Sequence, residues 1–104
     1  MPFFQQVYAL TRSIPMGKVT TYGELAKALG TRDARRVGHA LQANPDQSTP
    51  CHRVVSKDGR LAPNYAFGGN LEQRAKLIEE EVTFLDQEHV DLKKHLYRPT
   101  PPDL

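Results

Sequence analysis

Two short helical patterns, each bounded by its own start and stop signals, constrain the fold of this 104-residue chain more than any other feature. Thr21 and Glu24 have the spacing of a capping box, and Gly30 follows the apolar run, so we expect a helix between Thr21 and Gly30. Asp33 can cap the second pattern, which ends before Pro45. Two short helices that flank a tight turn have the outline of a helix-turn-helix.

The rest of the chain predicts a mainly α domain with a small β-hairpin. Apolar residues recur at helical spacing over residues 3–14. Residues 51–62 have the pattern of a short strand, a turn at 57–59 and a returning strand. A later helical pattern places Leu71, Ala75 and Ile78 on one face, and a small helix is expected from about Asp91. The Pro-rich residues 98–104 are expected to be a frayed tail.

The length and composition of the chain indicate one domain over residues 1–104. No apolar run approaches the roughly 20 residues that span a bilayer, so we expect no membrane partner. The N-terminus lacks the pattern of a signal peptide, and a single cysteine cannot form an internal disulfide. We therefore expect a cytoplasmic protein, associated with the nucleoid when it binds DNA. One thiol also argues against a structural metal site.

The charge is unevenly distributed along the chain. Through Arg60 there are nine Lys or Arg residues against four Asp or Glu residues, and from Leu61 onward there are five against eight. A basic N-terminal half can bind a polyanion, although an ordinary solvated surface with uneven charge has the same composition.

The only cysteine, Cys51, is followed by His52 and Arg53. A thiol attacks as a thiolate, so a nucleophilic Cys51 needs a base or a positive field, which His52 and Arg53 can supply. Neighbouring residues on a strand point to opposite faces, so direct contact between Cys51 and His52 is not assured, and a bridging water could carry the proton instead. A carboxylate from Glu79–Glu81 can orient the histidine, but spacing does not choose among the three. A buried, unreactive cysteine is the alternative.

Together these segments resemble the O6-alkylguanine-DNA alkyltransferases. The sequence PCHRV at Pro50–Val54 is similar to their active-site motif, which includes Arg53 and Val54. GKVTTYGELA at Gly17–Ala26 resembles the start of their DNA-binding helix-turn-helix. ARRVGHAL and ANP, within Ala34–Pro45, resemble their recognition helix and the asparagine turn after it. The resemblance covers roughly residues 3–82, and it implies a winged-helix-like helix-turn-helix domain of the alkyltransferase type.

The resemblance implies that the protein flips an O6-alkylguanine out of double-stranded DNA and moves the alkyl group irreversibly onto Cys51, without a cofactor or a metal. It also implies a role for each matching residue. His52 would act as a base through a water, with Glu80 orienting it. Arg35 would fill the gap left by the flipped base, with its neighbour Arg36 as the competing residue. The remaining matches are Tyr22 at the 3′ phosphate, Asn44 below the thiol and Tyr65 in the base pocket.

The small size and the sequences LAPNYAFGG and VDLKKHLY also resemble the alkyltransferase-like proteins. These bind the same lesions without repairing them and attract nucleotide excision repair proteins, which are then the expected partners. The usual glycine after the family's glutamate is Glu81 here. Both readings expect a monomer that binds DNA containing O6-alkylguanine, and they differ in whether Cys51 accepts the alkyl group.

Overall fold

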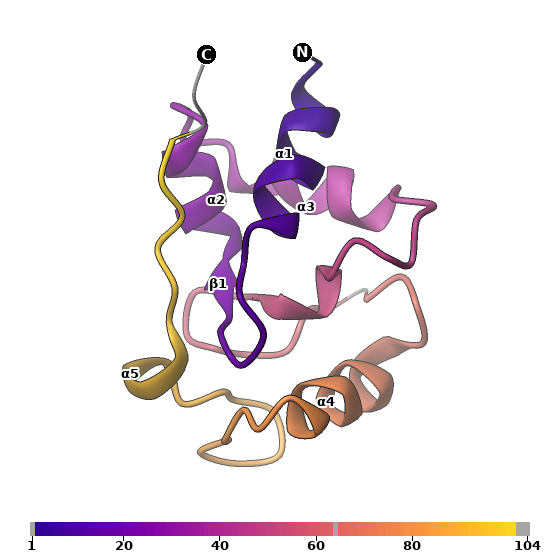
Figure 1. The fold of residues 1–104 in the computed structure, drawn as a ribbon, viewed down its shortest axis with the longest axis vertical. Helices are drawn as coiled ribbons and strands as arrows, with labels where there is room; N and C mark the ends of the chain where they lie inside the picture. The colour runs from indigo at the N-terminus through magenta and orange to yellow at the C-terminus, as the bar shows by residue number, and fades with distance from the viewer. Residues whose placement is uncertain (1, 64, 102–104) are drawn as a thin grey trace.

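Three helices form the N-terminal half of the protein in the computed structural model, which describes residues 2–63 and 65–101. They are α1 (Phe3–Arg12), α2 (Tyr22–Ala28) and α3 (Ala34–Gln42), and α3 packs against both of the others (Figure 1). The expected caps are present: Thr21 Oγ1 accepts a hydrogen bond from the Glu24 amide at 3.1 Å, and Asp33 accepts one from the Arg36 amide at 3.0 Å. The helix-turn-helix predicted from these signals is therefore correct.

The predicted β-hairpin is replaced by a two-stranded parallel sheet. Strand β1 (Thr20–Thr21) pairs with β2 (Val54–Val55), with Thr20 opposite Val54. The chain does turn after β2, where the Gly59 amide donates to the Ser56 carbonyl at 2.8 Å. However, the returning segment continues to a different partner, and Arg60 forms an antiparallel bridge with His89. The residues before β2 also differ from the prediction, because Cys51–Arg53 form a single 3-10 turn, η1.

Strand β2 lies between two apolar cores, which explains its parallel pairing. Val54 contributes to the core of the three N-terminal helices, whereas Val55 contributes to a second core. Both side chains are fully buried. A strand that is buried on both faces is typical of parallel pairing, whereas a two-stranded hairpin usually leaves one face in water. The second core consists of Val19, Val55, Leu61, Leu77, Val82 and Val90.

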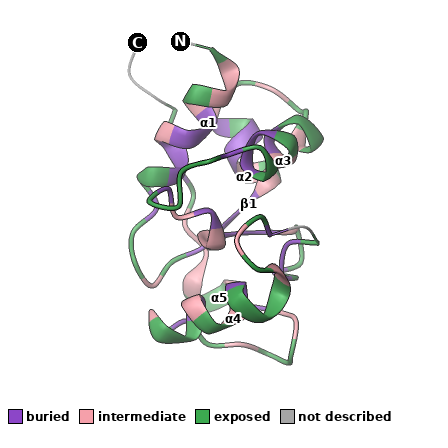
Figure 2. Ribbon diagram, turned by 90° about the vertical axis from the view of Figure 1, so that its right-hand side faces the viewer, coloured by how far each residue is buried: buried purple, intermediate pink, exposed green. Residues whose placement is uncertain are grey.

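The long C-terminal helix α4 (Gly69–Glu79) turns its apolar stripe outward. Leu71 is 83% exposed and Ile78 50% exposed, and Ala75 is exposed as well, so the helix appears largely green in Figure 2. A helix usually buries such a stripe. Here the buried residues are Gln73 and Leu77. Leu77 packs in the second core, whereas Gln73 forms hydrogen bonds to the segment that carries Cys51, as described below.

The last described residues run back along the N-terminal half (Figure 1). After the short helix α5 (Leu92–His95), which Asp91 caps as expected, the Tyr97 amide donates to the Val19 carbonyl at 2.7 Å. Within the expected frayed tail, Arg98 lies 3.5 Å from Glu24 and Pro99 is buried, and residues 102–104 are outside the described part. Across the described residues, no helix has the length and apolar character to cross a membrane.

Candidate active site

Cys51 lies at a pocket between the helix-turn-helix and the segment that leads to α4. The pocket has a volume of about 370 Å³, and its lining includes Tyr22, Arg35, Gly38, His39, Cys51 and Tyr65. The thiol is only 6% exposed. A hydrogen bond to the segment before η1 holds it in place, because the Cys51 amide donates to the Thr49 carbonyl at 2.7 Å. The pocket therefore presents a sulfur atom beside the helix that the sequence predicted to meet DNA.

Asn44 forms a hydrogen bond to the Cys51 sulfur. Its Nδ2 atom donates to Cys51 Sγ at 3.2 Å and to the Asp46 carbonyl at 2.9 Å, while its Oδ1 accepts from the Asp46 amide. Burial raises the pKa of the Cys51 thiol, and the Asn44 hydrogen bond opposes this rise without cancelling it. A thiol in this setting needs a base at the moment of reaction.

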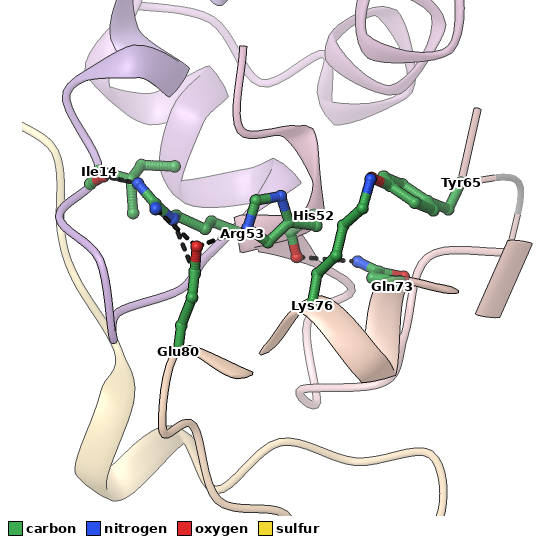
Figure 3. A network of polar contacts seen from close by, with 7 residues as sticks. All are labelled: Ile14, His52, Arg53, Tyr65, Gln73, Lys76 and Glu80. Carbon is green, nitrogen blue, oxygen red and sulfur yellow. Dashed lines mark hydrogen bonds and ion pairs between the residues drawn. The ribbon is translucent and has the colours of Figure 1, made fainter. Parts of the chain in front are cut away.

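His52 and Arg53 both turn toward one carboxylate, that of Glu80 (Figure 3). Glu80 Oε2 lies 3.0 Å from His52 Nε2, and Arg53 binds both carboxylate oxygens, at 3.0 and 2.7 Å. Arg53 also donates to the Ile14 carbonyl at 2.8 Å, which ties the pair to the end of α1. Glu79 and Glu81 are exposed, so geometry selects Glu80 from the three glutamates that spacing left open.

The protonation states of this cluster suit a base. Burial lowers the pKa of His52, although the Glu80 contact acts in the other direction, so the imidazole is neutral near pH 7. For Glu80, burial opposes ionisation, but the hydrogen bonds from Arg53 and His52 outweigh it, and the pKa falls below its ordinary value. No hydrogen bond joins Cys51 to His52 within residues 2–63 and 65–101, so a proton between them would pass through a water.

The inward face of α4 carries residues that the sequence analysis did not single out. Gln73 is fully buried; it donates to the carbonyls of His52 and Val54 and accepts from the Ala62 amide. Lys76 donates to the Tyr65 hydroxyl at 2.7 Å. Gln73, Lys76 and Glu80 stand at the i, i+3, i+7 spacing of one helix face, and this polar spacing beside a predicted nucleophile was the signal that could have found them.

The two arginines of α3 point in different directions. Arg35 lines the pocket and is exposed. Arg36 is also exposed, but its guanidinium lies 4.1 Å from the centre of the Phe3 ring, so it packs on α1. Tyr22 lines the pocket as well, and burial, helped by the Cys51 charge, raises the pKa of its hydroxyl to about 12. Of the predicted DNA-binding residues, the structure thus brings Tyr22 and Arg35 to the pocket and turns Arg36 away.

Two of the remaining predicted residues have different surroundings. Tyr65 is buried and lines the pocket, as the resemblance implies. Val54 belongs to the core and not to the pocket. In the part of the chain that the structure describes, no three His, Cys, Asp or Glu side chains come together in a group that could hold a metal ion.

Residues 2–83 match the family model described as the DNA-binding domain of 6-O-methylguanine DNA methyltransferase. The chain is 34% identical to alkyltransferase-like protein 1 of Schizosaccharomyces pombe, over 93% of this chain and 95% of that protein. It is 40% identical to the DNA base-flipping protein of Escherichia coli, over 89% of this chain and 72% of the relative.

A third relative is the methylated-DNA–protein-cysteine methyltransferase of Haemophilus influenzae, which is 34% identical over 92% of this chain. The chain spans about half, 54%, of that protein's length. Among solved structures, the S. pombe protein Atl1 in complex with damaged DNA containing O6-carboxymethylguanine matches with a TM-score of 0.79 at 32% identity. That match covers 93% of this chain and 95% of Atl1.

Proposed function

This chain belongs to the family of the O6-alkylguanine-DNA alkyltransferases, and on that premise we propose that it flips an O6-alkylguanine out of duplex DNA and transfers the alkyl group to Cys51. The observation that carries the proposal is the placement of Cys51 at a pocket on α3 with the His52–Glu80 pair beside it. A guanine O6 atom inside a duplex is out of reach of such a thiol, so the base must leave the stack.

The pocket is suited to a flipped base. Its volume of about 370 Å³ is in the range of small-molecule sites, and aromatic side chains from Tyr22 and Tyr65 line it. Arg35, at the start of α3, is free to enter the duplex at the position that the base leaves. The S. pombe relative in complex with DNA containing O6-carboxymethylguanine supports an alkylated guanine as the ligand.

The transfer follows from the protonation states. Neutral His52 takes the Cys51 proton through a water, and Glu80 stabilises the imidazolium that forms. The thiolate sulfur then bonds to the alkyl carbon, the bond from that carbon to O6 breaks, and its electron pair stays on the base. The guanine anion takes a proton from the solvent or from a nearby donor. Because the product is a thioether, each molecule reacts once.

A second candidate function is lesion binding without transfer, followed by attraction of nucleotide excision repair proteins. The observation in its favour is the match to alkyltransferase-like protein 1 over nearly the full length of both chains. The raised pKa of the Cys51 thiol is also compatible with an unreactive cysteine.

Intact-protein mass spectrometry after mixing with duplex DNA containing O6-methylguanine tests the choice. We expect a gain of one methyl group on the wild type and none on Cys51→Ser, with the serine variant still binding the lesion in a gel-shift assay. Tight binding by a wild type that gains no methyl group would select the second function. Transfer by Cys51→Ser would reject Cys51 as the acceptor.

A further inference from the structure

The apolar stripe of α4, formed by Leu71, Ala75 and Ile78, faces solvent. All three residues are exposed, and they stand at the i, i+4, i+7 spacing that places side chains on one face of a helix. A single exposed apolar residue is ordinary on a protein surface, whereas a helix normally buries a stripe of them. The stripe therefore needs an explanation beyond the packing of α4 on its own chain.

Arg74 holds a further exposed apolar residue beside the stripe. Its Nη1 atom donates to the carbonyls of Asp86 and Gln87, at 3.2 and 2.9 Å, and its guanidinium lies 4.4 Å from the centre of the Phe84 ring. Leu85, which is 69% exposed, belongs to the segment that these contacts fix. The stripe and Leu85 together make an apolar surface whose parts are held in place.

Acidic side chains surround this surface. Residues 71–88 contain six Asp or Glu residues and two Lys or Arg residues. Of these, Lys76 and Glu80 bind groups on the inward side of α4, and Arg74 is covered by the Phe84 ring. Four carboxylates remain exposed around the stripe: those of Glu72, Glu79, Glu81 and Asp86. Hydrogen bonds from Glu88 and His89 lower the pKa of Asp86, so this group is ionised at neutral pH.

The stripe is separate from the pocket that holds Cys51. Among the described residues, the pocket lining comes from α2, α3 and the segments on either side of β2, and no residue of α4 contributes to it. Figure 1 shows α4 at the opposite end of the molecule from α2 and α3. A ligand in the pocket would therefore leave the stripe accessible.

We propose that the stripe is a docking site for a basic amphipathic helix of another protein, which can bind while the pocket is occupied. The apolar side of that helix would cover the stripe, and its Lys or Arg residues would meet the carboxylates of Glu72 and Glu79. A symmetric dimer through this face would place the same carboxylates against each other, which argues against a second copy. The carboxylates also repel nucleic acid and anionic lipid.

The site is small, so it fits a transient partner. The stripe spans two turns of helix, and an interface of this size is at the weak end of specific protein contacts. We expect a Kd of about 10 to 100 µM for one helix at low salt, which is the affinity of a contact that forms and dissolves rapidly. The exposed carboxylates should make this affinity depend on ionic strength.

Synthetic peptides test the proposal in the absence of DNA. The probe is a fluorescein-labelled helical peptide of about four turns, with Leu on one face and Lys on both flanks, and the matched peptide carries Glu in place of Lys. Fluorescence anisotropy should show binding of the Lys peptide that weakens at higher salt, and much weaker binding of the Glu peptide. No binding of the Lys peptide, or equal binding of both peptides, would overturn the proposal.

Variants of the protein locate the site. Leu71→Gln combined with Ile78→Gln should weaken binding of the Lys peptide about tenfold or more, because the apolar contact is lost. Met16→Gln, which replaces an exposed apolar residue in another loop, is the matched control and should change little. Glu72→Lys combined with Glu79→Lys should exchange the preference in favour of the Glu peptide. Equal effects of the Met16 and the stripe variants would reject the stripe as the site.

Two further measurements separate the proposal from its alternatives. Sedimentation velocity should show a monomer, and a dimer that dissociates in Leu71→Gln with Ile78→Gln would overturn the proposal in favour of a second copy. The stripe variants should keep wild-type affinity for duplex DNA containing O6-methylguanine, and a parallel loss of lesion binding would reject a separate site. These outcomes do not depend on whether Cys51 accepts a methyl group.

Discussion

At the scale of single residues, Arg35 and Arg36 have adjacent positions but different surroundings. Arg36 rests on the Phe3 ring, whereas Arg35 lines the pocket without a polar partner in the described residues. A helix rotates by about 100° per residue, so neighbours cannot share one face. The structure therefore separates a residue that is available to DNA from one that packs on the protein.

Arg35→Ala should weaken binding to damaged duplex by about tenfold or more and binding to damaged single strand much less. The reason is that unstacking a base costs a few kcal/mol, which an inserted side chain offsets only in a duplex. Gel-shift titrations on both substrates measure the difference. Arg36→Ala is the matched control and should lower the melting temperature slightly while keeping the duplex preference. Equal losses on both substrates for Arg35→Ala would indicate a plain phosphate contact.

Tyr22 offers a second test at this scale. A Cβ atom at Gly38 would lie 3.9 Å from the Tyr22 ring, and the Tyr22 hydroxyl, with a pKa of about 12, is neutral at physiological pH. If the ring acts by its bulk against the phosphate, Tyr22→Phe should be mild and Tyr22→Ala should lose the preference for alkylated over normal duplex. Both variants should keep the salt dependence of binding, because a neutral phenol releases no counterions. An unchanged preference in Tyr22→Ala would argue against a role in flipping.

At the scale of elements, α4 and the residue that follows it hold the segment that carries Cys51. Glu80 follows the helix and joins His52 to Arg53, while Gln73 holds the backbone on both sides of Arg53. Glu81 comes directly after Glu80, the C-cap of the helix, and its φ of 68° lies in the left-handed region. Both glutamates can be tested separately, and the exposed Glu79 is a control for each.

Glu80→Gln should lower the free energy of unfolding by about 2 kcal/mol at pH 7, because Arg53 and His52 lose a charged partner. The folded pKa of Glu80 lies below its ordinary value of 4.5. Its contribution is therefore complete above about pH 5 and disappears as the pH falls through the folded pKa. Urea unfolding of both proteins between pH 7 and pH 3 should show the difference narrowing with acid. Glu79→Gln should change little, and a constant difference across this range would contradict the assignment.

Glu81→Gly should stabilise the protein by about 0.5 to 1 kcal/mol. A non-glycine residue in the left-handed region costs roughly 1 to 2 kcal/mol, and glycine removes this cost while it gains some entropy in the unfolded chain. Urea unfolding at pH 7 measures the change. Glu79→Gly, inside the helix, should instead destabilise by up to about 1 kcal/mol. A loss of stability in both variants would show that Glu81 makes a contribution that outweighs its backbone strain.

At the scale of the whole molecule, the two apolar cores are joined by a two-stranded sheet with two residues in each strand. The β1–β2 pair and the Val19 bridge to Leu96 lie between them. Cys51 begins the turn η1, which directly precedes β2. The candidate active site takes Asn44 and Tyr22 from one core and Glu80 from the side of the other. Its geometry therefore depends on both cores being folded together.

Val90→Ala, in the second core, should lower stability by about 2 to 3 kcal/mol through the cavity that it creates. If the molecule unfolds as one unit, far-ultraviolet circular dichroism and the exposure of the Cys51 thiol should give the same midpoint in urea. The wild type should show the same agreement at a higher midpoint. Thiol exposure well before the loss of helical signal would show that the segment around Cys51 opens before the helices unfold.

The features that depend on near neighbours in the chain could be predicted from the amino-acid sequence. The caps of α2 and α3 join residues three positions apart, so Thr21 and Asp33 could be identified from spacing alone. The segment around Cys51 could likewise be singled out, because the thiol, the base and the arginine are adjacent. The helix-turn-helix and the candidate nucleophile could therefore be identified without coordinates.

Contacts between segments that lie far apart in the chain could not be predicted from the sequence, because they depend on how the helices pack. Glu80 and His52 are 28 residues apart, and three consecutive glutamates have the same local pattern, so packing had to choose among them. The sequence analysis predicted the wrong partner for β2, and it did not predict that the apolar stripe of α4 faces solvent. Periodicity reports which residues share a face, but a helix that bonds to buried backbone turns its polar face inward. Because this face of α4 is turned inward, Lys76 also reaches the Tyr65 hydroxyl.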